Sequence, residues 1–397
     1  MPVYMYLVFF FVVGGISFGI SHYTLSRLGD LFERIDTLSG FGLGMTGELS
    51  IQYYIISAAM IVLYFIVSKG FPLLLMRVFG WLSGLWMAYL ILVLFYAGPL
   101  HVLEYCFIHI LGFDNQHFMI SGITVLSLIL VHFGFIWGVY RATRAPHLFT
   151  VEIANPKISP EFNGYRILQL SDVHIGPTIG EGLIHQLRSI IASARPDLIV
   201  MTGDLVDGEV KQLGAEVKSF LALSELAPQG MLLITGNHEY ISGAAQWVSF
   251  IKDNGGRVLE NEHVTIERGN AKISVIGVED WDAERFDSSR RPALNEAIDG
   301  VPKEAFKVLL AHQPKAANEA ATLGIDLQLS GHTHAGQIFP FNVLIYLDQP
   351  FNVGRYELGS MTLYVNPGTA YWGPPLRIGT RSEVTLFKLT GSDTLQS

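Results

Sequence analysis

Two histidines stand one residue apart in Gly331-His332-Thr333-His334, directly after the apolar run Ile325–Leu329. If that run is a strand, a turn at its end lets both imidazole rings point to the same side, and Gly331 contributes no Cβ to crowd the turn. Paired neutral imidazoles suit a metal ion, because imidazole is the commonest metal-ligating side chain. On this pair alone the alternative, surface histidines or histidines satisfied within the core, stays open.

Polar side chains follow four other apolar runs in the same way. The five runs, all expected to be strands, are Tyr165–Leu170, Asp197–Met201, Met231–Thr235, Lys307–Ala311 and Asp326–Leu329. They are followed by seven potential ligands, in chain order Asp172, His174, Asp204, Asn237, His312, His332 and His334. Open α/β sheets place their sites at the carboxyl ends of strands. Five strand ends that each deliver Asp, His or Asn therefore predict one metal site rather than scattered loop residues.

The number and type of these ligands indicate the chemistry. Seven protein ligands with oxygen and nitrogen donors are more than one ion takes, so we expect two divalent ions bridged by a carboxylate, best supplied by Asp204. Such a pair holds a bridging hydroxide and clamps a phosphoryl oxygen, as in-line phosphoester cleavage requires. His238, beside Asn237, is expected to protonate the leaving oxygen, with Asp207 accepting a hydrogen bond from its ring. The ligand set suits Mn²⁺, Fe or Zn²⁺.

Composition excludes some classes of protein. The chain has 397 residues and a formal net charge of −9, so a nucleic-acid partner is not expected. Basic and acidic side chains balance in residues 1–146, which leaves the whole negative charge on residues 147–397. Cys106 is the only cysteine, so neither an intrachain disulfide nor a cysteine-rich zinc site is possible.

The N-terminal part contains long uncharged runs. Four spans are predicted at about 3–20, 51–67, 78–98 and 118–140, each about the length that crosses a bilayer as a helix. The alternatives are a signal peptide for the first run and buried helices of a large soluble domain for all four. Lys and Arg are in excess on the side shared by both termini and the loop between the second and third spans. This charge bias predicts a multi-pass cell-membrane protein whose C-terminal domain lies in the cytoplasm.

The C-terminal part alternates strand and helix patterns, which indicates an α/β domain with mixed sheets at residues 147–397, after a transmembrane region at 1–146. Helices are expected at Leu183–Ala194, Val210–Leu226 and Ala244–Asn254. Further strands are expected at Val264–Glu267, Ile273–Val278, Met361–Val365 and Val384–Leu389.

The polar motifs also match a known family in order and spacing. Asp172-x-His174, Gly203-Asp204-x-x-Asp207, Gly236-Asn237-His238-Glu239, His312 and Gly331-His332-x-His334 resemble the five-part signature of the calcineurin-like metallophosphoesterases. The resemblance covers roughly residues 150–397. The residues flanking Asp172 and His334 resemble a membrane-associated subgroup that includes bacterial proteins acting on lipid-linked phosphates. The resemblance implies a four-layer αββα sandwich, here preceded by a four-helix transmembrane region.

The resemblance also implies a role for each motif residue. Asp172, His174, Asp204 and His334 would bind the first metal ion, and Asp204, Asn237, His312 and His332 the second. His238 would be the catalytic histidine. Glu239 stands where many members of the family have Asp. We expect its side chain to support the residues that bind the metal ions rather than to bind an ion itself. The activity implied is that of a metal-dependent phosphoric ester hydrolase.

The substrate is less constrained by the sequence. The segment Ile338–Leu358 begins just after the histidine pair and is strongly apolar at first, so it is either core or a surface that meets a bilayer or an acyl chain. With the predicted spans, it favours a lipid-linked phosphate substrate. Arg355 and Arg377 are candidate phosphate-binding residues, with ordinary surface arginines as the alternative. A second hypothesis is a membrane sensor or scaffold that binds a phosphorylated ligand at the metal site without turnover.

Overall fold

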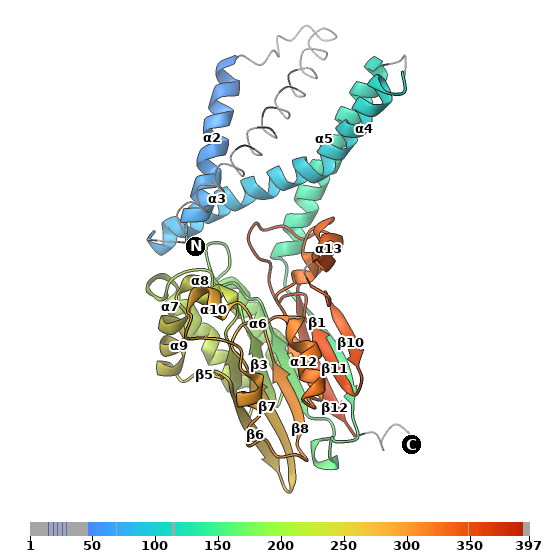
Figure 1. The fold of residues 1–397 in the computed structure, drawn as a ribbon. Coiled ribbons are helices and arrows are strands. Elements are labelled where there is room, and N and C mark those ends of the chain that lie inside the picture. The colour runs from blue at the N-terminus through green and yellow to red at the C-terminus, as the bar shows by residue number, and fades with distance from the viewer. Residues whose placement is uncertain are drawn as a thin grey trace. The chain divides into compact units, whose positions relative to one another are not determined.

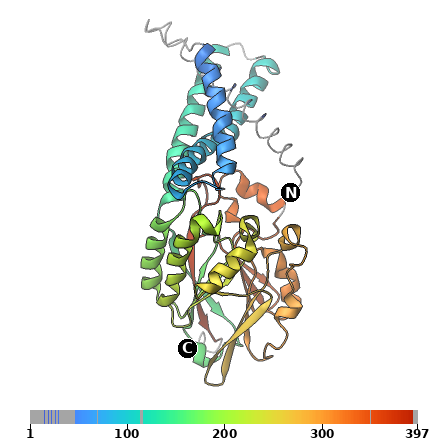
Figure 2. The same cartoon turned by 90° about the vertical axis from the view of Figure 1, so that its left-hand side faces the viewer.

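The computed structural model describes residues 47–68, 70–112, 116–347 and 349–391, with single positions at 15, 19, 22, 26 and 29. The chain divides into two compact units. The N-terminal unit comprises the described residues up to Val67, Leu74–Tyr140 and Pro374–Leu376. The C-terminal unit comprises Ser68–Leu73, Arg141–Gly373 and the described residues from Arg377 onward. Figures 1 and 2 show the ribbon of the chain from two directions.

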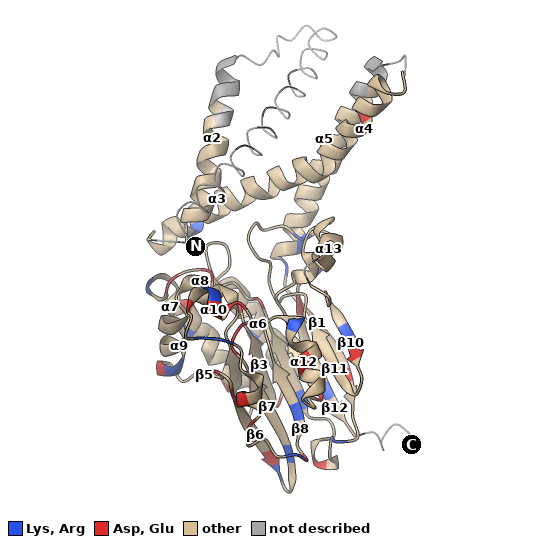
Figure 3. Cartoon of the chain, in the orientation of Figure 1, with Lys and Arg blue, Asp and Glu red and all other residues tan. Residues whose placement is uncertain are grey.

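Apolar helices make up most of the described part of the N-terminal unit. They are α2 (Gly47–Ile66), α3 (Leu73–Leu92), the π-helix η1 (Val93–Ala97), α4 (Gly98–His109) and most of α5 (Gln116–Thr143). The elements α3, η1 and α4 follow one another without a break and form one helical stretch of 37 residues. Figure 3 shows few Lys, Arg, Asp or Glu residues on these helices and many more on the C-terminal unit.

Two helices in the described part of the chain are long and apolar enough to cross a membrane, Leu73–His109 and Gly122–Thr143. They overlap the third and fourth predicted spans, and residues 99–109 continue the third as helix. The second predicted span falls on α2, whose apolar stretch Ile55–Ile66 is shorter than a span. The first predicted span, 3–20, lies outside the described ranges. The predicted four-helix transmembrane region is therefore not confirmed, and length and composition support two of its helices.

Two six-stranded mixed sheets form the centre of the C-terminal unit. The first has the order β1 (His147–Ala154), β12 (Glu383–Thr390), β2 (Arg166–Leu170), β3 (Leu198–Thr202), β4 (Met231–Ile234) and β5 (Arg257–Val258). The second has the order β10 (Gly354–Leu358), β11 (Met361–Val365), β9 (Leu327–Ser330), β8 (Phe306–Leu310), β7 (Ala271–Gly277) and β6 (Glu262–Arg268). The strands β2 to β5 are parallel, as are β7, β8, β9 and β11. Parallel strands end at one edge of their sheet, so their terminal residues collect there.

Helices and short helical turns connect these strands. The helices are α6 (Glu181–Ala194), α7 (Val210–Leu221), α8 (Asn237–Ser242), α9 (Ala244–Asp253), α10 (Ala283–Phe286), α11 (Leu294–Ala297), α12 (Ala317–Thr322) and α13 (Phe341–Leu344). The 3₁₀ turns are η2 (Pro160–Phe162), η3 (Ala222–Leu226), η4 (Pro314–Ala316), η5 (His334–Gly336) and η6 (Ile345–Leu347).

The C-terminal unit is layered. Apolar side chains of both sheets, among them Ile167 and Val308, pack together between the sheets. A second cluster packs Leu309 of β8 against Leu294 of α11 and Ala317 of α12. Figure 1 shows α7 and α9 on one side of this unit and α12 on the other. The expected α/β fold with mixed sheets is confirmed, and its helices cover the sheets from both sides.

Each strand predicted from the sequence coincides with an observed one, whereas β1, β5 and β10 have no predicted counterpart. Both β1 and β10 lie at a sheet edge and expose alternate residues, and β5 has only two residues. The segment Ile338–Leu358 forms α13, η6 and β10. The side chains of α13 and η6 are exposed or half-buried, so this part of the segment is surface rather than core.

Candidate metal centre

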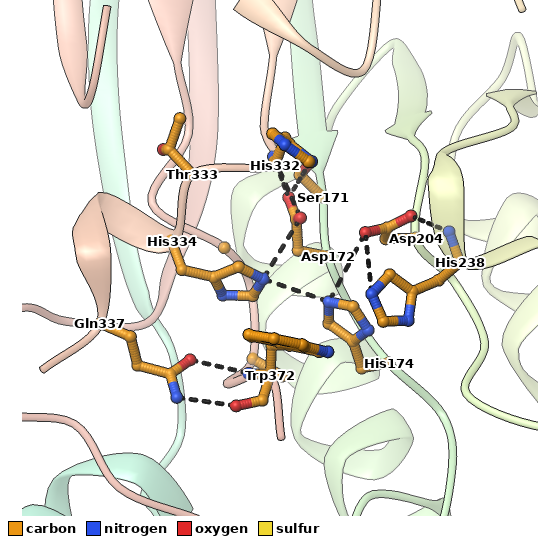
Figure 4. Close-up of polar contacts among 12 residues, drawn as sticks. Ser171, Asp172, His174, Asp204, His238, His332, Thr333, His334, Gln337 and Trp372 are labelled. Atoms are coloured by element: carbon orange, nitrogen blue, oxygen red, sulfur yellow. Dashed lines mark hydrogen bonds and ion pairs between the residues drawn. The ribbon is translucent and has the colours of Figure 1, made fainter. Parts of the chain in front are cut away.

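The seven predicted ligands follow β2, β3 and β4 of the first sheet and β8 and β9 of the second, each at the carboxyl end of its strand. The structure brings these five strand ends together, and Figure 4 shows most of the side chains in one cluster. Five of the seven ligands have a positive φ, namely Asp172, His174, Asp204, His332 and His334. Left-handed backbone at non-glycine residues costs energy and concentrates at functional sites.

A first group of side chains consists of Asp172, His174 and His334. His334 Nε2 lies 3.1 Å from His174 Nε2 and 3.3 Å from Asp172 Oδ1. His174 Nδ1 lies 3.0 Å from Asp207 Oδ1, and a carboxylate only accepts, so Nδ1 carries the proton and Nε2 presents a lone pair to the group. Burial lowers the pKa of His334 to about 4, which keeps its ring neutral.

A second group consists of Asp204, His312 and His332, with Asn237 beside them. His332 Nδ1 lies 3.0 Å from Asn237 Oδ1 and 3.2 Å from His312 Nε2, and His312 Nε2 lies 3.2 Å from Asp204 Oδ2. His312 Nδ1 is 2.8 Å from the Thr202 carbonyl oxygen and must donate to it, so Nε2 is the ring nitrogen that faces the group.

Acceptor atoms at these separations repel one another unless positive charge lies among them. Burial opposes a charged imidazole, yet the Asp204 carboxylate raises the pKa of His312 well above its ordinary value. Burial also lowers the pKa of His332 to about 4, so that its ring is neutral. A buried set of carboxylate, carboxamide and imidazole acceptors that attracts positive charge fits a divalent cation.

Asp204 joins the two groups. Its Oδ1 accepts the His238 backbone N–H at 2.8 Å, while its Oδ2 lies 3.2 Å from His312 Nε2 and 3.9 Å from His174 Nε2. Burial raises the pKa of a carboxyl group, but the adjacent His312 and His238 outweigh it and hold the pKa of Asp204 well below its ordinary value. One oxygen of Asp204 is thus fixed by the backbone, and the other faces both groups as a carboxylate.

His238 and Asp207 lie side by side at the edge of the centre. His238 Nδ1 is 2.5 Å from Asp207 Oδ1, and the same oxygen contacts His174 Nδ1. Burial disfavours the charged ring of His238, but Asp207 and Asp204 together raise its pKa to about 10. The sequence predicted the contact between Asp207 and His238, whereas the contact between Asp207 and His174 was missed. Asp207 therefore orients a candidate ligand and a candidate acid at once.

Glu239 holds the Asp204 loop in place. Its carboxylate accepts the backbone N–H groups of Gly236, Asp204, Leu205 and Val206 at 2.6–3.2 Å. The side chain is almost completely buried and contacts no ring nitrogen of the two groups in any described hydrogen bond. This agrees with the expectation that Glu239 lies behind the ligands.

Gly331 is needed for a different reason than the one expected from the turn. Its φ is not positive, but a Cβ at this position would overlap Ser171 Oγ and Asp172 Oδ2. The following N–H, that of His332, donates to both carboxylate oxygens of Asp172 at 3.0 and 3.1 Å. The absent side chain therefore lets the loop after β9 approach the carboxylate after β2.

The structure does not favour either arginine as a phosphate ligand. Arg377 is fully buried, and its guanidinium donates to the carbonyl oxygens of Pro367, Ala370 and Arg381. Arg355 lies on the edge strand β10, where it pairs with Glu357 and donates to the Glu152 carbonyl oxygen. Arg377 thus braces the loop behind His334, and the contacts of Arg355 lie outside the candidate centre.

Two residues of the centre were not among the predicted site residues. Ser171 is buried and donates to Asp172 Oδ2 at 2.5 Å. Trp372 lies with its ring centroid 5.8 Å from that of His238, and Gln337 holds its backbone through two hydrogen bonds of 2.7 Å. Figure 4 shows the indole beside His334 and His174. The position of Ser171 before a ligand was a visible signal, whereas Trp372 reaches the site only through the tertiary fold.

Comparisons with known proteins identify the family that the motifs resemble. The calcineurin-like phosphoesterase family profile matches residues 165–336. A transmembrane protein with metallophosphoesterase domain from Danio rerio is 36% identical over 274 residues, which are 66% of this chain and 61% of the relative. An uncharacterized metallophosphoesterase of Campylobacter jejuni is 30% identical over 358 residues, which are 85% of this chain and 90% of the relative.

The chain thus spans about three fifths of the length of the Danio rerio relative. The Campylobacter jejuni relative is matched over nearly its whole length. The motifs follow five strands that converge in the fold, and the sequence similarities lead to the same family as the motifs. The chain belongs to the calcineurin-like metallophosphoesterase family.

Proposed function

We propose that this chain is a phosphoric ester hydrolase that uses two divalent metal ions, Mn, Fe or Zn. Asp172, His174, Asp204 and His334 would hold one ion, and Asp204, Asn237, His312 and His332 the other. The observation that carries this proposal is the position of Asp204 Oδ2, which lies between a ring nitrogen of each group. Bound divalent ions would polarise a phosphoryl oxygen and lower the pKa of water, which supplies a nucleophile at neutral pH.

In this proposal His238 is the general acid. Its side chain is more exposed than those of Asp204 and His174, so a leaving oxygen has access to it. Asp207 accepts a hydrogen bond from the Nδ1–H of His238, which directs Nε2 away from Asp207, and Nε2 lies 4.0 Å from Asp204 Oδ2. A protonated Nε2 would donate its proton to the leaving oxygen as the ester bond breaks. A ligand-binding scaffold has no need of this pair, which favours the hydrolase over the sensor hypothesis.

Removal of the metal ions tests the hydrolase directly. Dialysis of the full chain against a chelator is expected to reduce hydrolysis of bis(p-nitrophenyl) phosphate by about 10³-fold, because Lewis-acid stabilisation is worth several kcal/mol. Addition of Mn²⁺, Fe²⁺ or Zn²⁺ is expected to restore the rate. Binding of these ions without any turnover of a panel of phosphate mono- and diesters would instead support the sensor or scaffold.

A lipid-linked phosphate is the substrate class that we favour for this site. The apolar helices and the similarity to a transmembrane protein of Danio rerio support a membrane location. We expect the metal-loaded chain in nanodiscs to cleave phosphorylated lipids, or lipids linked to a nucleotide diphosphate, with a higher kcat/KM than their soluble headgroup esters. Equal kcat/KM values for the two sets would argue against a lipid-linked substrate.

We also propose how the chain is oriented in the membrane. A multi-pass arrangement in the cell membrane with the C-terminal unit in the cytoplasm follows from the excess of Lys and Arg on one side of the predicted spans. A reporter fused after Ser397 would be active in the cytoplasm. Activity of the reporter only on the opposite side of the membrane would reverse this orientation.

A further inference from the structure

An exposed apolar surface lies directly after the histidine pair. It consists of Phe339, Phe341, Val343, Leu344, Tyr346 and Leu347, which we call the apolar strip. The chain carries no charged residue from Ala335 to Leu347. Leu347 is 87% exposed, so its side chain projects from the surface and does not line a groove. Isolated exposed apolar residues are ordinary, but six within nine positions form a patch that marks an interaction site.

The apolar strip is fixed to the rim of the metal centre. It starts two residues after Gln337, whose side chain clamps the backbone of Trp372 beside His238. The Phe339 N–H donates to the Ile378 carbonyl oxygen at 3.1 Å, and Asn352 Nδ2 donates to the Asn342 carbonyl oxygen at 3.3 Å. Figure 1 shows α13 at the upper end of the C-terminal unit, above β10 and β11. The strip is therefore an ordered extension of the site.

The loop that carries Trp372 also meets the end of an apolar helix. Ala142, in the last turn of α5 and part of the C-terminal unit, packs with Ala370 and Tyr371 in one buried cluster. The helix to which it belongs is long and apolar enough to cross a membrane. Arg141 and Arg144 stand at its end, as basic residues do where a helix leaves a bilayer. The same loop thus adjoins a candidate membrane boundary, the apolar strip and the metal centre.

The charge pattern distinguishes the strip from another exposed apolar group. Trp281 and Phe286 are also about half exposed, but the charged side chains of Glu284 and Arg285 accompany them. The strip combines aliphatic and aromatic side chains without any charge. That is the composition of segments that enter the boundary between headgroups and acyl chains, since a charge there would have to leave water.

We propose that the apolar strip inserts into the headgroup region of the lipid bilayer and holds the opening of the metal centre at the membrane surface. This proposal rests on the proposed function, because it assumes that the phosphate to be cleaved belongs to a lipid. The strip brings His238 and the two ligand groups to the depth of lipid phosphates. Substrate then enters from the bilayer, past Trp372, rather than from bulk water.

The test uses site-directed spin labels on the full chain in phosphatidylcholine nanodiscs. Cys106 is replaced by Ala, and single cysteines are introduced as Leu347→Cys or Val343→Cys, both at exposed positions. Ala192→Cys is the matched control, because this exposed residue lies near the end of α6, before β3 begins and thus away from the carboxyl ends of the strands. Collisions with molecular oxygen, which partitions into the bilayer, are compared with collisions with water-soluble Ni(II)-EDDA.

We expect labels at 343 and 347 to collide more with oxygen than with Ni(II)-EDDA, and the label at 192 to show the reverse. An aqueous pattern at 343 and 347 would overturn the proposal. Low accessibility to both reagents would also overturn it, because another part of this chain or a second copy would then cover the strip. The labels report position without metal or turnover, so failure here is distinguishable from failure of the proposed hydrolase.

Discussion

Replacement of Asp204 by Asn is expected to lower kcat/KM for a phosphodiester by about 10³-fold or more, because several kcal/mol of metal-based stabilisation depends on this carboxylate. Asp204 Oδ2 is the oxygen that faces both ligand groups, and the substitution removes its charge. The fold is expected to persist, since an amide oxygen still accepts the His238 N–H that Asp204 Oδ1 now accepts. Steady-state kinetics with metal-loaded full-length protein measure the effect.

Asp197→Asn provides the matched control. Asp197 directly precedes β3, at the end of the strand opposite Asp204, where it accepts from the Arg166 N–H and pairs with Arg268. Its replacement removes the same charge from the same strand without touching the candidate centre, so turnover is expected to stay near the wild-type value. If Asp204→Asn retained the activity of Asp197→Asn, the bridging role of Asp204 would be wrong.

Replacement of His238 by Asn is expected to lower kcat by about 10²–10⁴-fold for esters with alkyl leaving groups, the range that general acid catalysis contributes. The loss is expected to be much smaller for p-nitrophenyl esters, because p-nitrophenolate leaves without a proton. His238 is not among the proposed ligands, so the variant is expected to bind metal as the wild type does. Rates for the two ester classes, with metal content measured in parallel, test the assignment.

The pH dependence of the rate tests the same role of His238 as the general acid. The protonated ring is the active form, so the wild-type rate is expected to fall as pH rises through the pKa of His238. Asp207 and Asp204 raise this pKa against the effect of burial, which places the fall above the ordinary histidine range. The variant is expected to lack this alkaline limb. His185→Gln, on the exposed surface of α6, is the control for loss of a histidine.

An equal loss with both ester classes would contradict the role of His238 as the acid. Asp207→Asn removes the charge that both His238 and His174 contact, so its comparison with His238→Asn separates the two functions of Asp207. This variant is expected to weaken metal binding by about 10–100-fold, the usual effect of losing the partner of a ligating histidine. His238→Asn leaves that partner in place.

Much of the candidate centre could be predicted because it depends on local pattern. Each ligand follows an apolar run of strand length, and the carboxyl ends of parallel strands converge whatever the details of the loops. Helix α6 and the buried strand β3 are similarly evident, since their periodicity and continuous apolar character decide their structure. The sequence therefore indicated both the α/β sheets and the residues at their ends.

The remainder depends on contacts between distant parts of the chain. Nothing near Arg377 in the sequence indicates that its charge is buried, because most of its partners are loop carbonyl groups and the ring of His334, 3.3 Å away, comes from a distant part of the chain. The approach of Trp372 to His238 and the double role of Asp207 arise from tertiary packing. The strand β10 was missed although its polar and apolar residues alternate as in a half-buried strand, because the expectation for Ile338–Leu358 rested on the apolar beginning of that segment. Gly331 was expected to ease a turn, but its decisive neighbours, Ser171 and Asp172, follow the strand β2, which is distant in the sequence.

The central claim is that two ions share Asp204, and Mn²⁺ binding tests it most directly. The full-length wild type, stripped of metal and titrated with Mn²⁺, is expected to bind two ions per chain and to show the electron paramagnetic resonance spectrum of an exchange-coupled pair. Asp204→Asn is expected to lose the coupled spectrum, whereas Asp197→Asn keeps it. One ion per chain in the wild type, or two ions without coupling, would contradict a shared carboxylate at Asp204.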